Sequence, residues 1–204
     1  MTVLGRTKKE VVAEFRTAEL LEAARKVFAE KGFHDATVDD IADAAGVAKG
    51  TVYLYYRSKR AVYWAALERG IAGLVEEIQS QLATQDTLKN KIRAFIAIKV
   101  QYFEQQRDFF KIYFSEFGSA FTHPVQIRKH FEELYLRQAR VLEAVLEDGI
   151  KRKAIRPIRT DTAALAISDL TRGIITQRLL GWSKGDVESD TAFIFDLVWK
   201  GIAR

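Results

Sequence analysis

The sequence predicts an all-α fold in which an N-terminal head of three helices precedes a larger helical domain. Apolar residues recur at intervals of three and four residues along most of the chain, and β-branched residues nowhere alternate over the length of a strand. Only two prolines, Pro124 and Pro157, interrupt the 204 residues. We expect the head within residues 1–60 and the second domain within residues 61–204, with a helix from residue 58 bridging the two.

The composition is that of an ordinary globular protein, since 48% of the residues are hydrophobic and 29% are charged. No run approaches the ~18 apolar residues of a membrane-spanning helix, and the N-terminus lacks the apolar core of a secretion signal. The chain has no cysteine, which excludes disulfides and thiolate ligands. We therefore expect a cytoplasmic protein with no membrane partner. The net charge of +5 suits a polyanionic partner but does not identify one.

The first helix is predicted from a capping box at its start. The Thr7 hydroxyl and the Glu10 carboxylate can each accept a hydrogen bond from the other residue's backbone amide. Gly32 is the residue type that most readily follows a helix end, so we expect the helix to run to Lys31.

The stretch TVDDIADAAGVAKGTVYLYYRSK, residues 37–59, predicts two short helices joined by a tight turn. Thr37 is placed to cap a helix whose first turn is acidic. Gly46 ends that helix, because the residue after a helix often needs a positive φ. A second helix follows over residues 48–55, and Ser58 caps a third. This helix-turn-helix arrangement is the one that sets a recognition helix in the major groove of DNA.

The charges of this stretch favour a nucleic-acid partner. Between Ala44 and Ala61 there are four cations and no acid, and tyrosines lie among them. Lysine and tyrosine side chains both donate to phosphates, and phosphate contacts supply most of the affinity for DNA. Lys59 and Arg60 lie in the first turn of the third helix, where cations oppose the helix dipole unless an anion approaches. The alternative is a solvated basic turn beside a core of tyrosines.

Residues 16–62 resemble the N-terminal domain of the TetR/AcrR family of bacterial ligand-responsive transcriptional repressors. The matching segments are Phe28 with AEKGF at residues 29–33, AGV at 45–47, GT-x-Y at 50–53 and Tyr-aromatic-x-x-Lys at 55–59. Four positions depart from the family pattern: Ala48 replaces a polar helix cap, Tyr56 replaces a Phe, and Arg60-Ala61 replaces an acidic pair.

The resemblance implies a homodimeric transcriptional regulator that binds double-stranded DNA at a palindromic operator. By match to the family motif, phosphate contacts are expected from Thr37, Thr51, Tyr53, Tyr55 and Lys59. Contacts to base edges are expected from Lys49, Gly50 and Leu54, which lie on the recognition helix. We expect no enzymatic activity and no cofactor.

Apolar periodicity and turn residues predict six further helices after the recognition helix. Their expected ranges are 58–83, 88–103, 109–117, 124–151, 160–181 and 186–202, with Pro124 in the first turn of the fourth. Proteins of the family that the chain resembles tend to have a glycine near Lys153, after the helix expected over residues 124–151. The last helix is apolar nearly all round and needs cover on two sides. The resemblance implies that the last two helices pair with their copies in a second subunit as a four-helix bundle.

The segment FFKIYFSEF, residues 109–117, has more aromatic rings than one helix face can bury. The rings either complete an ordinary core or bound an apolar pocket between helices, where the family places its effectors. The candidate lining residues are Phe95, Phe103, Phe110, Tyr113, Phe114, Phe117, Phe131 and Tyr135. The polar residues that could hold a head group are Arg172, Lys99, Arg128, Arg137 and Gln177. The effector is expected to be small and hydrophobic, and a resemblance to the branch that senses fatty acyl thioesters makes fatty acyl-CoA one candidate.

Catalytic and metal sites are not predicted. Ser115 and Ser168 lack a nucleophile elbow and a base, and no carboxylate cluster accompanies the histidines His34, His123 and His130 to form a metal site. Two rival interpretations stay open: a ligand-blind DNA-binding regulator or activator, and a small helical enzyme or ligand carrier with a borrowed DNA-binding head. Only the regulators require a preference for one DNA sequence.

Overall fold

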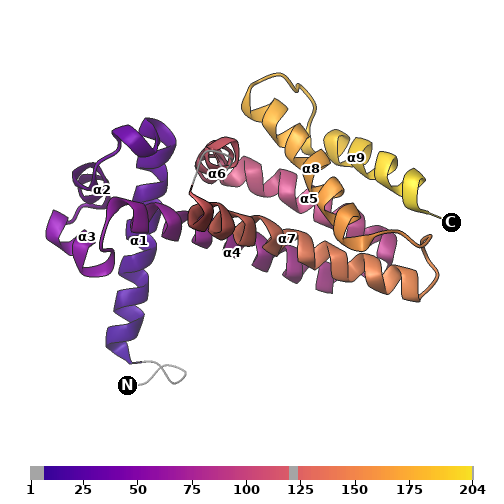
Figure 1. The fold of residues 1–204 in the computed structure, drawn as a ribbon, viewed down its shortest axis with the longest axis horizontal. Coiled ribbons are helices and arrows are strands. Elements are labelled where there is room, and N and C mark those ends of the chain that lie inside the picture. The colour runs from indigo at the N-terminus through magenta and orange to yellow at the C-terminus, as the bar shows by residue number, and fades with distance from the viewer. Residues whose placement is uncertain (1–6, 120–123, 204) are drawn as a thin grey trace. The chain divides into compact units, whose positions relative to one another are not determined.

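The computed structural model describes residues 7–119 and 124–203, and within them the chain forms nine α-helices (Figure 1). The helices are α1 (Lys8–Asp35), α2 (Val38–Ala45), α3 (Lys49–Tyr55), α4 (Lys59–Ala83), α5 (Leu88–Gln105), α6 (Arg107–Ser119), α7 (Val125–Lys151), α8 (Thr160–Leu179) and α9 (Val187–Ile202). The predicted all-α fold is confirmed. None of the described helices has the length and apolar character needed to span a bilayer.

The chain packs as two compact units. The first contains the residues up to Gly70 together with Asp108–Glu116 of α6, and the second contains Ile71–Arg107 and Phe117–Arg204. The division within α4 therefore falls ten residues after the domain boundary predicted at residue 60, and α6 contributes to both units. The functional domains at residues 1–60 and 61–204 stay a prediction.

The core of the first unit is built by the apolar stripes that the sequence predicts. Phe28 of α1, Ile41 of α2, Val52 of α3 and Val62 of α4 are all buried, with exposed fractions of 2% or less. Gly32 has φ +74° and ψ 173°, so it interrupts the helical conformation where the sequence places the end of the first helix. Helices α2 and α3 are short, so their stability depends on the burial of such side chains.

Residues of α6 complete this core from a distant part of the sequence. A Cβ atom on Gly70 of α4 would lie 2.2 Å from the ring of Phe109, so the ring packs directly on the helix backbone. The Tyr63 hydroxyl donates to the Glu116 carboxylate at 3.0 Å, and the Tyr63 ring lies 5.1 Å from Phe28 in an edge-on arrangement. Burial raises the pKa of the Tyr63 phenol, and the nearby Glu116 carboxylate raises it further.

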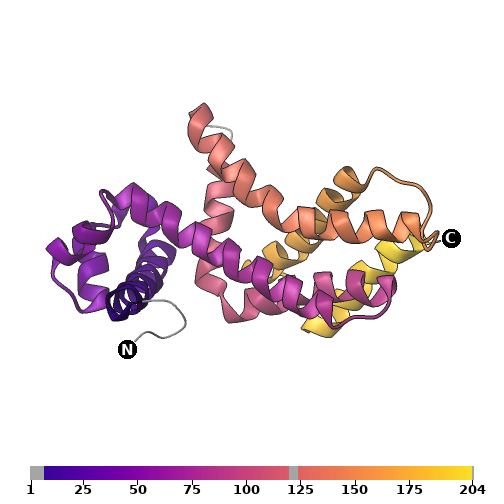
Figure 2. The same ribbon diagram turned by 90° about the horizontal axis from the view of Figure 1, so that it is seen from below.

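The second unit is a helical layer structure around α5. Helix α9 packs along α5, α7 packs along α8, and α5 also contacts α7 and α8 (Figure 1 and Figure 2). The shared core contains fully buried side chains from three of these helices, including Phe95 of α5, Leu142 of α7 and Ile194 of α9.

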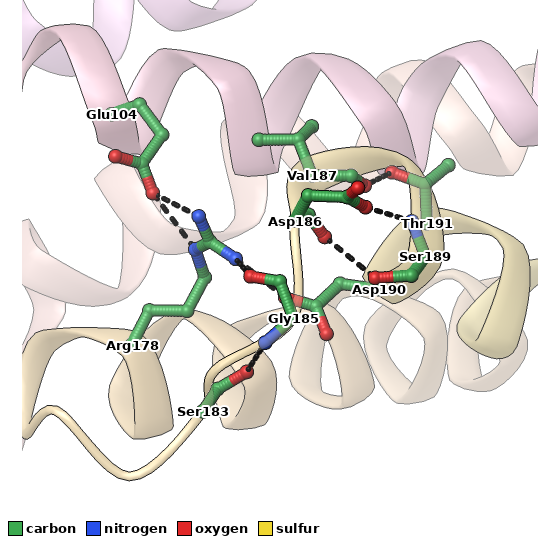
Figure 3. A network of polar contacts seen from close by, with 9 residues as sticks. All are labelled: Glu104, Arg178, Ser183, Gly185, Asp186, Val187, Ser189, Asp190 and Thr191. Carbon is green, nitrogen blue, oxygen red and sulfur yellow. Dashed lines mark hydrogen bonds and ion pairs between the residues drawn. The ribbon is translucent and has the colours of Figure 1, made fainter.

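A polar network fixes the connection between α8 and α9 (Figure 3). Arg178 of α8 donates to Glu104 of α5 at 2.8 Å, to the Gly185 carbonyl at 2.7 Å and to Asp190 of α9 at 2.7 Å. The Asp186 carboxylate accepts from the Ser189 amide at 2.7 Å and so caps α9, which begins at Val187. A guanidinium that bonds three segments at once holds the α8–α9 loop against α5.

Several helix ends differ from the sequence prediction. Helix α5 continues to Gln105 instead of ending at residue 103, and α6 spans Arg107–Ser119 instead of residues 109–117. Pro124 is the N-cap of α7 and not a first-turn residue, and α8 ends at Leu179, before the expected Gly181. Lys153, where similar proteins tend to have glycine, follows α7 with φ +58°. A side chain with a Cβ atom is strained in this left-handed conformation, by roughly 1–2 kcal/mol.

Replacing Lys153 by glycine should therefore stabilise the protein. The substitution Lys153→Gly relieves the steric strain, although glycine also makes the unfolded chain more flexible, so the expected gain is about 1 kcal/mol. Chemical denaturation measures it as a higher midpoint at an unchanged slope. The matched control is Lys151→Gly, which places a glycine in the last turn of α7 and should destabilise the chain.

Candidate functional site

Helix α2 is held at its start by two cooperating residues. The Thr37 hydroxyl accepts from the Asp40 amide at 3.1 Å, and the Asp40 carboxylate accepts from the Thr37 amide at 2.9 Å. Asp40 also accepts from the Lys31 ammonium at 2.8 Å. The hydrogen bond from Lys31, followed by those from Thr37, lowers the pKa of Asp40 to about 2. The cap of α2 is therefore ionised, and its contribution to stability persists until the pH falls well below 4.

The turn between α2 and α3 has the geometry that its glycine predicts. Gly46 adopts the left-handed conformation with φ +66°, and the Val47 amide closes the helix end on the Ala42 carbonyl at 3.0 Å. Ala48 is the N-cap of α3 and provides no side-chain hydrogen bond. An unoccupied cap leaves amide groups at the start of α3 open to another acceptor.

Helix α3 buries one side and exposes the other. Val52 is completely buried, whereas Leu54 is 83% exposed and Tyr53 is 47% exposed. Lys49, Gly50 and Tyr55 are also exposed, and Thr51 is half-buried. The structure thus brings together on α3 six of the eight residues predicted to contact DNA, while Thr37 caps α2 and Lys59 begins α4.

Lys49 is paired with an acid in the DNA-free chain. Its ammonium lies 2.7 Å from the Asp39 carboxylate, and both side chains are more than half exposed. The hydrogen bond with Asp39 raises the pKa of Lys49. An approaching phosphate or base must compete with this carboxylate, so Asp39 tunes the charge that Lys49 can offer.

Lys59 has an internal role that the sequence did not reveal. Its ammonium donates to the carbonyls of Ala36 at 2.7 Å and of His34 at 3.0 Å, and it lies 4.7 Å above the Phe33 ring. These contacts tie the start of α4 to the connection between α1 and α2. Its predicted role as a phosphate donor stays a prediction, with the third hydrogen of the ammonium as the group available for it.

The predicted effector residues divide between the two units. Phe110, Tyr113 and Phe114 belong to the first unit, where ring contacts at 5.8 Å and 5.7 Å join Phe114 to Phe110 and to Tyr113. The other six are residues of the second unit: Phe95, Phe103, Phe117, Phe131, Tyr135 and Arg172.

In the second unit three of these rings form a cluster with a charged group. Phe117 lies 6.1 Å from Phe131 and 5.5 Å from Tyr135, and the Arg172 guanidinium lies 4.0 Å above the Phe117 ring. Asp169 accepts from both the Tyr135 hydroxyl and Arg172. Burial, and then the bond to Asp169, raises the pKa of Tyr135. The cluster therefore combines stacked apolar rings with a neutral phenol and one ion pair.

Lys99 is the most unusual charged residue of the second unit. It is 3% exposed, and its ammonium lies 3.4 Å from the Ser168 carbonyl and 5.3 Å from the centre of the Phe95 ring. Burial lowers its pKa from 10.5 to about 7, because the charged form loses its water. Of the other polar candidates, Arg128, Arg137 and Gln177 are exposed.

Metal binding finds no support in the described part of the chain, where no three histidine or acidic side chains gather. His34 is exposed, and its ring meets the Phe33 ring edge-on with 5.7 Å between the ring centres. His123 lies outside the described residues.

Residues 20–66, which include α2, α3 and the start of α4, match the sequence family described as bacterial regulatory proteins, tetR family. The head of the chain is therefore a TetR-family N-terminal domain. The match covers the helix-turn-helix head, so the predicted resemblance is confirmed where its motifs lie.

Of two relatives that this chain resembles, one is named as a transcriptional activator and the other as a transcriptional repressor. The chain is 33% identical over 99 residues to the transcriptional activator FasR of Mycolicibacterium smegmatis, a match that covers 48% of this chain and 45% of FasR. It is 29% identical over 163 residues to the transcriptional repressor KstR2 of Rhodococcus jostii, covering 74% of this chain and 78% of KstR2. The match thus spans less than half the length of FasR.

The fold of the chain is also that of a solved regulator with a bound ligand. The structure of FadR from Bacillus subtilis in complex with stearoyl-CoA superposes with a TM-score of 0.80 over 90% of this chain and 98% of FadR, at 21% identity. At this identity the likeness establishes the shared fold.

The buried ammonium predicts a pH dependence of stability. The folded pKa of Lys99 is about 7 and the ordinary value is 10.5, so between these pH values the unfolded chain binds more protons. Folding is therefore penalised fully below pH 7, and the penalty falls as pH rises, by up to about 1.4 kcal/mol per pH unit. Lys99→Met should be more stable than the wild type at pH 7, with a difference that shrinks towards pH 9.

Denaturation at a series of pH values measures this difference. The matched control is Lys91→Met on the same helix, whose partly exposed side chain should give a pH-independent difference. A constant gap between the wild type and Lys99→Met would contradict the assigned burial of the charge.

Proposed function

We propose that this chain is a TetR-family transcriptional regulator that binds palindromic operator DNA as a homodimer and responds to a small apolar effector. The observation that carries the proposal is the outward face of α3, where Lys49, Tyr53 and Leu54 are exposed on a helix fixed from behind by Val52. A short exposed helix after a glycine turn fits the major groove. The relatives FasR and KstR2 support regulation of transcription.

The DNA contacts we propose follow from where the side chains lie. Lys49, Gly50 and Leu54 would meet base edges, where a lysine can donate to guanine and an apolar side chain can contact a thymine methyl group. Thr37, Thr51, Tyr53, Tyr55 and Lys59 would contact phosphates and fix the register of the head. Such contacts make affinity depend steeply on salt.

The second copy of the chain would bind through α8 and α9. Phe193 and Leu197 lie one turn apart on α9 and are 64% and 55% exposed, although Ile194 and Phe195 beside them are buried. Leu170 of α8 is also an exposed apolar residue. A monomer rarely exposes such a row, and a symmetric pair of helices would cover it. The Arg178 network holds this helix pair in place (Figure 3).

The effector would act through a difference in affinity between two states of the dimer. If it binds better to a state in which the two heads are wrongly spaced, it weakens operator binding by the reciprocal factor. The aromatic cluster of the second unit supports an apolar ligand, and the stearoyl-CoA in the FadR structure supports an acyl chain as its body. Helix α6 is the candidate connection, because it supplies residues to both units.

Whether the regulator activates or represses transcription depends on the position of the operator. The two relatives differ in this respect, because FasR is an activator and KstR2 a repressor. We favour repression with release by the effector. The rival in which the head serves a helical enzyme or carrier finds no group of histidine and acidic side chains among the described residues that could hold a catalytic metal ion.

Selection of bound sequences from random DNA tests the proposal directly. The purified chain should enrich a palindrome whose half-sites lie about 34 Å apart or a multiple of that spacing. The variant Phe193→Glu should be monomeric in sedimentation and should lose most operator affinity, because the two heads are no longer joined. Leu54→Glu, which alters only the head, should abolish selection but leave the dimer intact. Failure to enrich any sequence would contradict the proposal.

The Asp39–Lys49 pair predicts a gain of affinity on losing a carboxylate. Asp39→Asn frees the Lys49 ammonium and removes a negative charge that faces the DNA phosphates. Affinity for the operator should rise at low salt, and the slope of log affinity against log salt should steepen by about one unit. Fluorescence anisotropy over a salt series measures both, and Lys49→Ala should change the slope in the opposite sense. Equal slopes for all three proteins would show that Lys49 does not neutralise the DNA.

A further inference from the structure

Helix α5 carries a charge in the middle of its buried aromatic face. Phe95, Lys99 and Phe103 are spaced four residues apart and therefore lie on one side of the helix. Both phenylalanines are completely buried and Lys99 is 3% exposed. A lysine in such a stripe is costly unless its charge has a function or a partner.

The Lys99 ammonium lacks a counter-ion among the described residues. Its hydrogen bond goes to the Ser168 carbonyl at 3.4 Å, a long contact for a group with three hydrogens to donate. The neighbouring acid, Asp169, already accepts from Tyr135 and Arg172. Lys99 and Arg172 carry two positive charges against the one negative charge of Asp169, so the group lacks one anion.

Ser168 presents a second unused donor at the same place. Its side chain is 2% exposed, and its hydroxyl oxygen has no hydrogen-bond partner. Buried hydroxyls without partners are uncommon in folded proteins. Because the Ser168 carbonyl is the group that Lys99 contacts, the free hydroxyl and the free ammonium hydrogens belong to one contact between α5 and α8.

One carboxylate would satisfy both groups. Its two oxygens can accept from an ammonium and from a hydroxyl at once, and charge-assisted bonds of this kind are the strong ones. The buried Phe95 ring lies 5.3 Å from the ammonium, and Phe103 is buried on the same side of α5, so both suit an apolar body attached to that carboxylate. A phosphate carries more charge and more oxygens than these two donors can match.

We propose that the second unit binds an amphiphilic monocarboxylic acid whose carboxylate is held by the Lys99 ammonium and the Ser168 hydroxyl. Binding of the acid does not depend on the proposed function. Only its consequence, the release of operator DNA, rests on that function. It narrows the effector from any apolar molecule to a free acid, as distinct from an acyl thioester.

When the carboxylic acid binds above pH 7, Lys99 should also take up a proton. The charged groups that act on Lys99 are Asp169 and Arg172 of α8, and burial outweighs both in lowering its pKa to about 7. Tyr135 of α7, whose pKa is raised, stays neutral in this range. A bound carboxylate restores the charged form of Lys99. Affinity for the acid should therefore be highest below pH 7 and fall as the pH rises above it.

Isothermal titration with dodecanoate, dodecanol and dodecanoyl-CoA tests the proposal. Wild-type protein should bind dodecanoate at least about tenfold more tightly than dodecanol, the expected effect of one charge-assisted bond. Lys99→Met should remove that preference and leave dodecanol binding unchanged, and Ser168→Ala should reduce it. Lys91→Met, a matched loss of one charge on the same helix, should behave as the wild type. At pH 8, titrations in two buffers should show uptake of about one proton.

A second monocarboxylate probe, 4-phenylbutyrate, is titrated in the same way. Three results would overturn the proposal: equal affinity for dodecanoate and dodecanol, tighter binding of dodecanoyl-CoA than of dodecanoate, or no binding of either dodecanoate or 4-phenylbutyrate. Proton uptake is measured on the wild type and so does not depend on the folding of a variant. Operator selection is measured without ligand. A chain that selects an operator but ignores carboxylates would contradict this inference and leave the proposed function standing.

Discussion

The packing of Phe109 on the backbone of α4 at Gly70 is the contact on which the first unit depends. Only a residue without a side chain lets the ring come so close, since a Cβ atom there would lie 2.2 Å from it. A head of about 70 residues buries so little apolar surface that its stability is marginal. Residues of α6 supply what is missing: Phe109, Phe110, Ile112 and Tyr113 are all buried, and Glu116 bonds the Tyr63 hydroxyl.

This constraint gives a physical basis for a response to a ligand. The same helix continues from Glu116 into Phe117, whose ring packs with Phe131 and Tyr135 beneath the Arg172 guanidinium in the second unit. Residues of one helix therefore belong to both units. A ligand that rearranges the contacts of Phe117 would act on a helix whose other residues complete the DNA-binding head, which is the kind of shared element that coupling between sites requires.

The features that sequence predicted well are local ones. The capping box at Thr7, the cap at Thr37 and the left-handed turn at Gly46 depend on residues within one turn, so the chain specifies them without its tertiary context. What sequence did not predict depends on distant contacts. The sequence predicts Lys59 only as a phosphate donor. Its hydrogen bonds to the carbonyls of His34 and Ala36 join residues that are far apart in the chain. The sequence predicts the aromatic residues as the lining of one effector pocket. In the structure they are divided between two units, because α6 contributes to both. Lys99 offered a detectable signal, a cation four residues from Phe95 and from Phe103, yet its missing counter-ion follows only from the packing of α8.

Hydrogen exchange of the backbone amides of α2 and α3 in the variant Phe109→Ala tests most directly whether the head depends on α6. Removing this ring leaves a cavity that costs roughly 3–5 kcal/mol, and the account predicts that amides of the head, distant in sequence, exchange at least about tenfold faster. Phe193→Ala, which truncates an exposed ring of α9, should leave them unchanged. Faster exchange confined to α6, with α2 and α3 protected as in the wild type, would contradict the account.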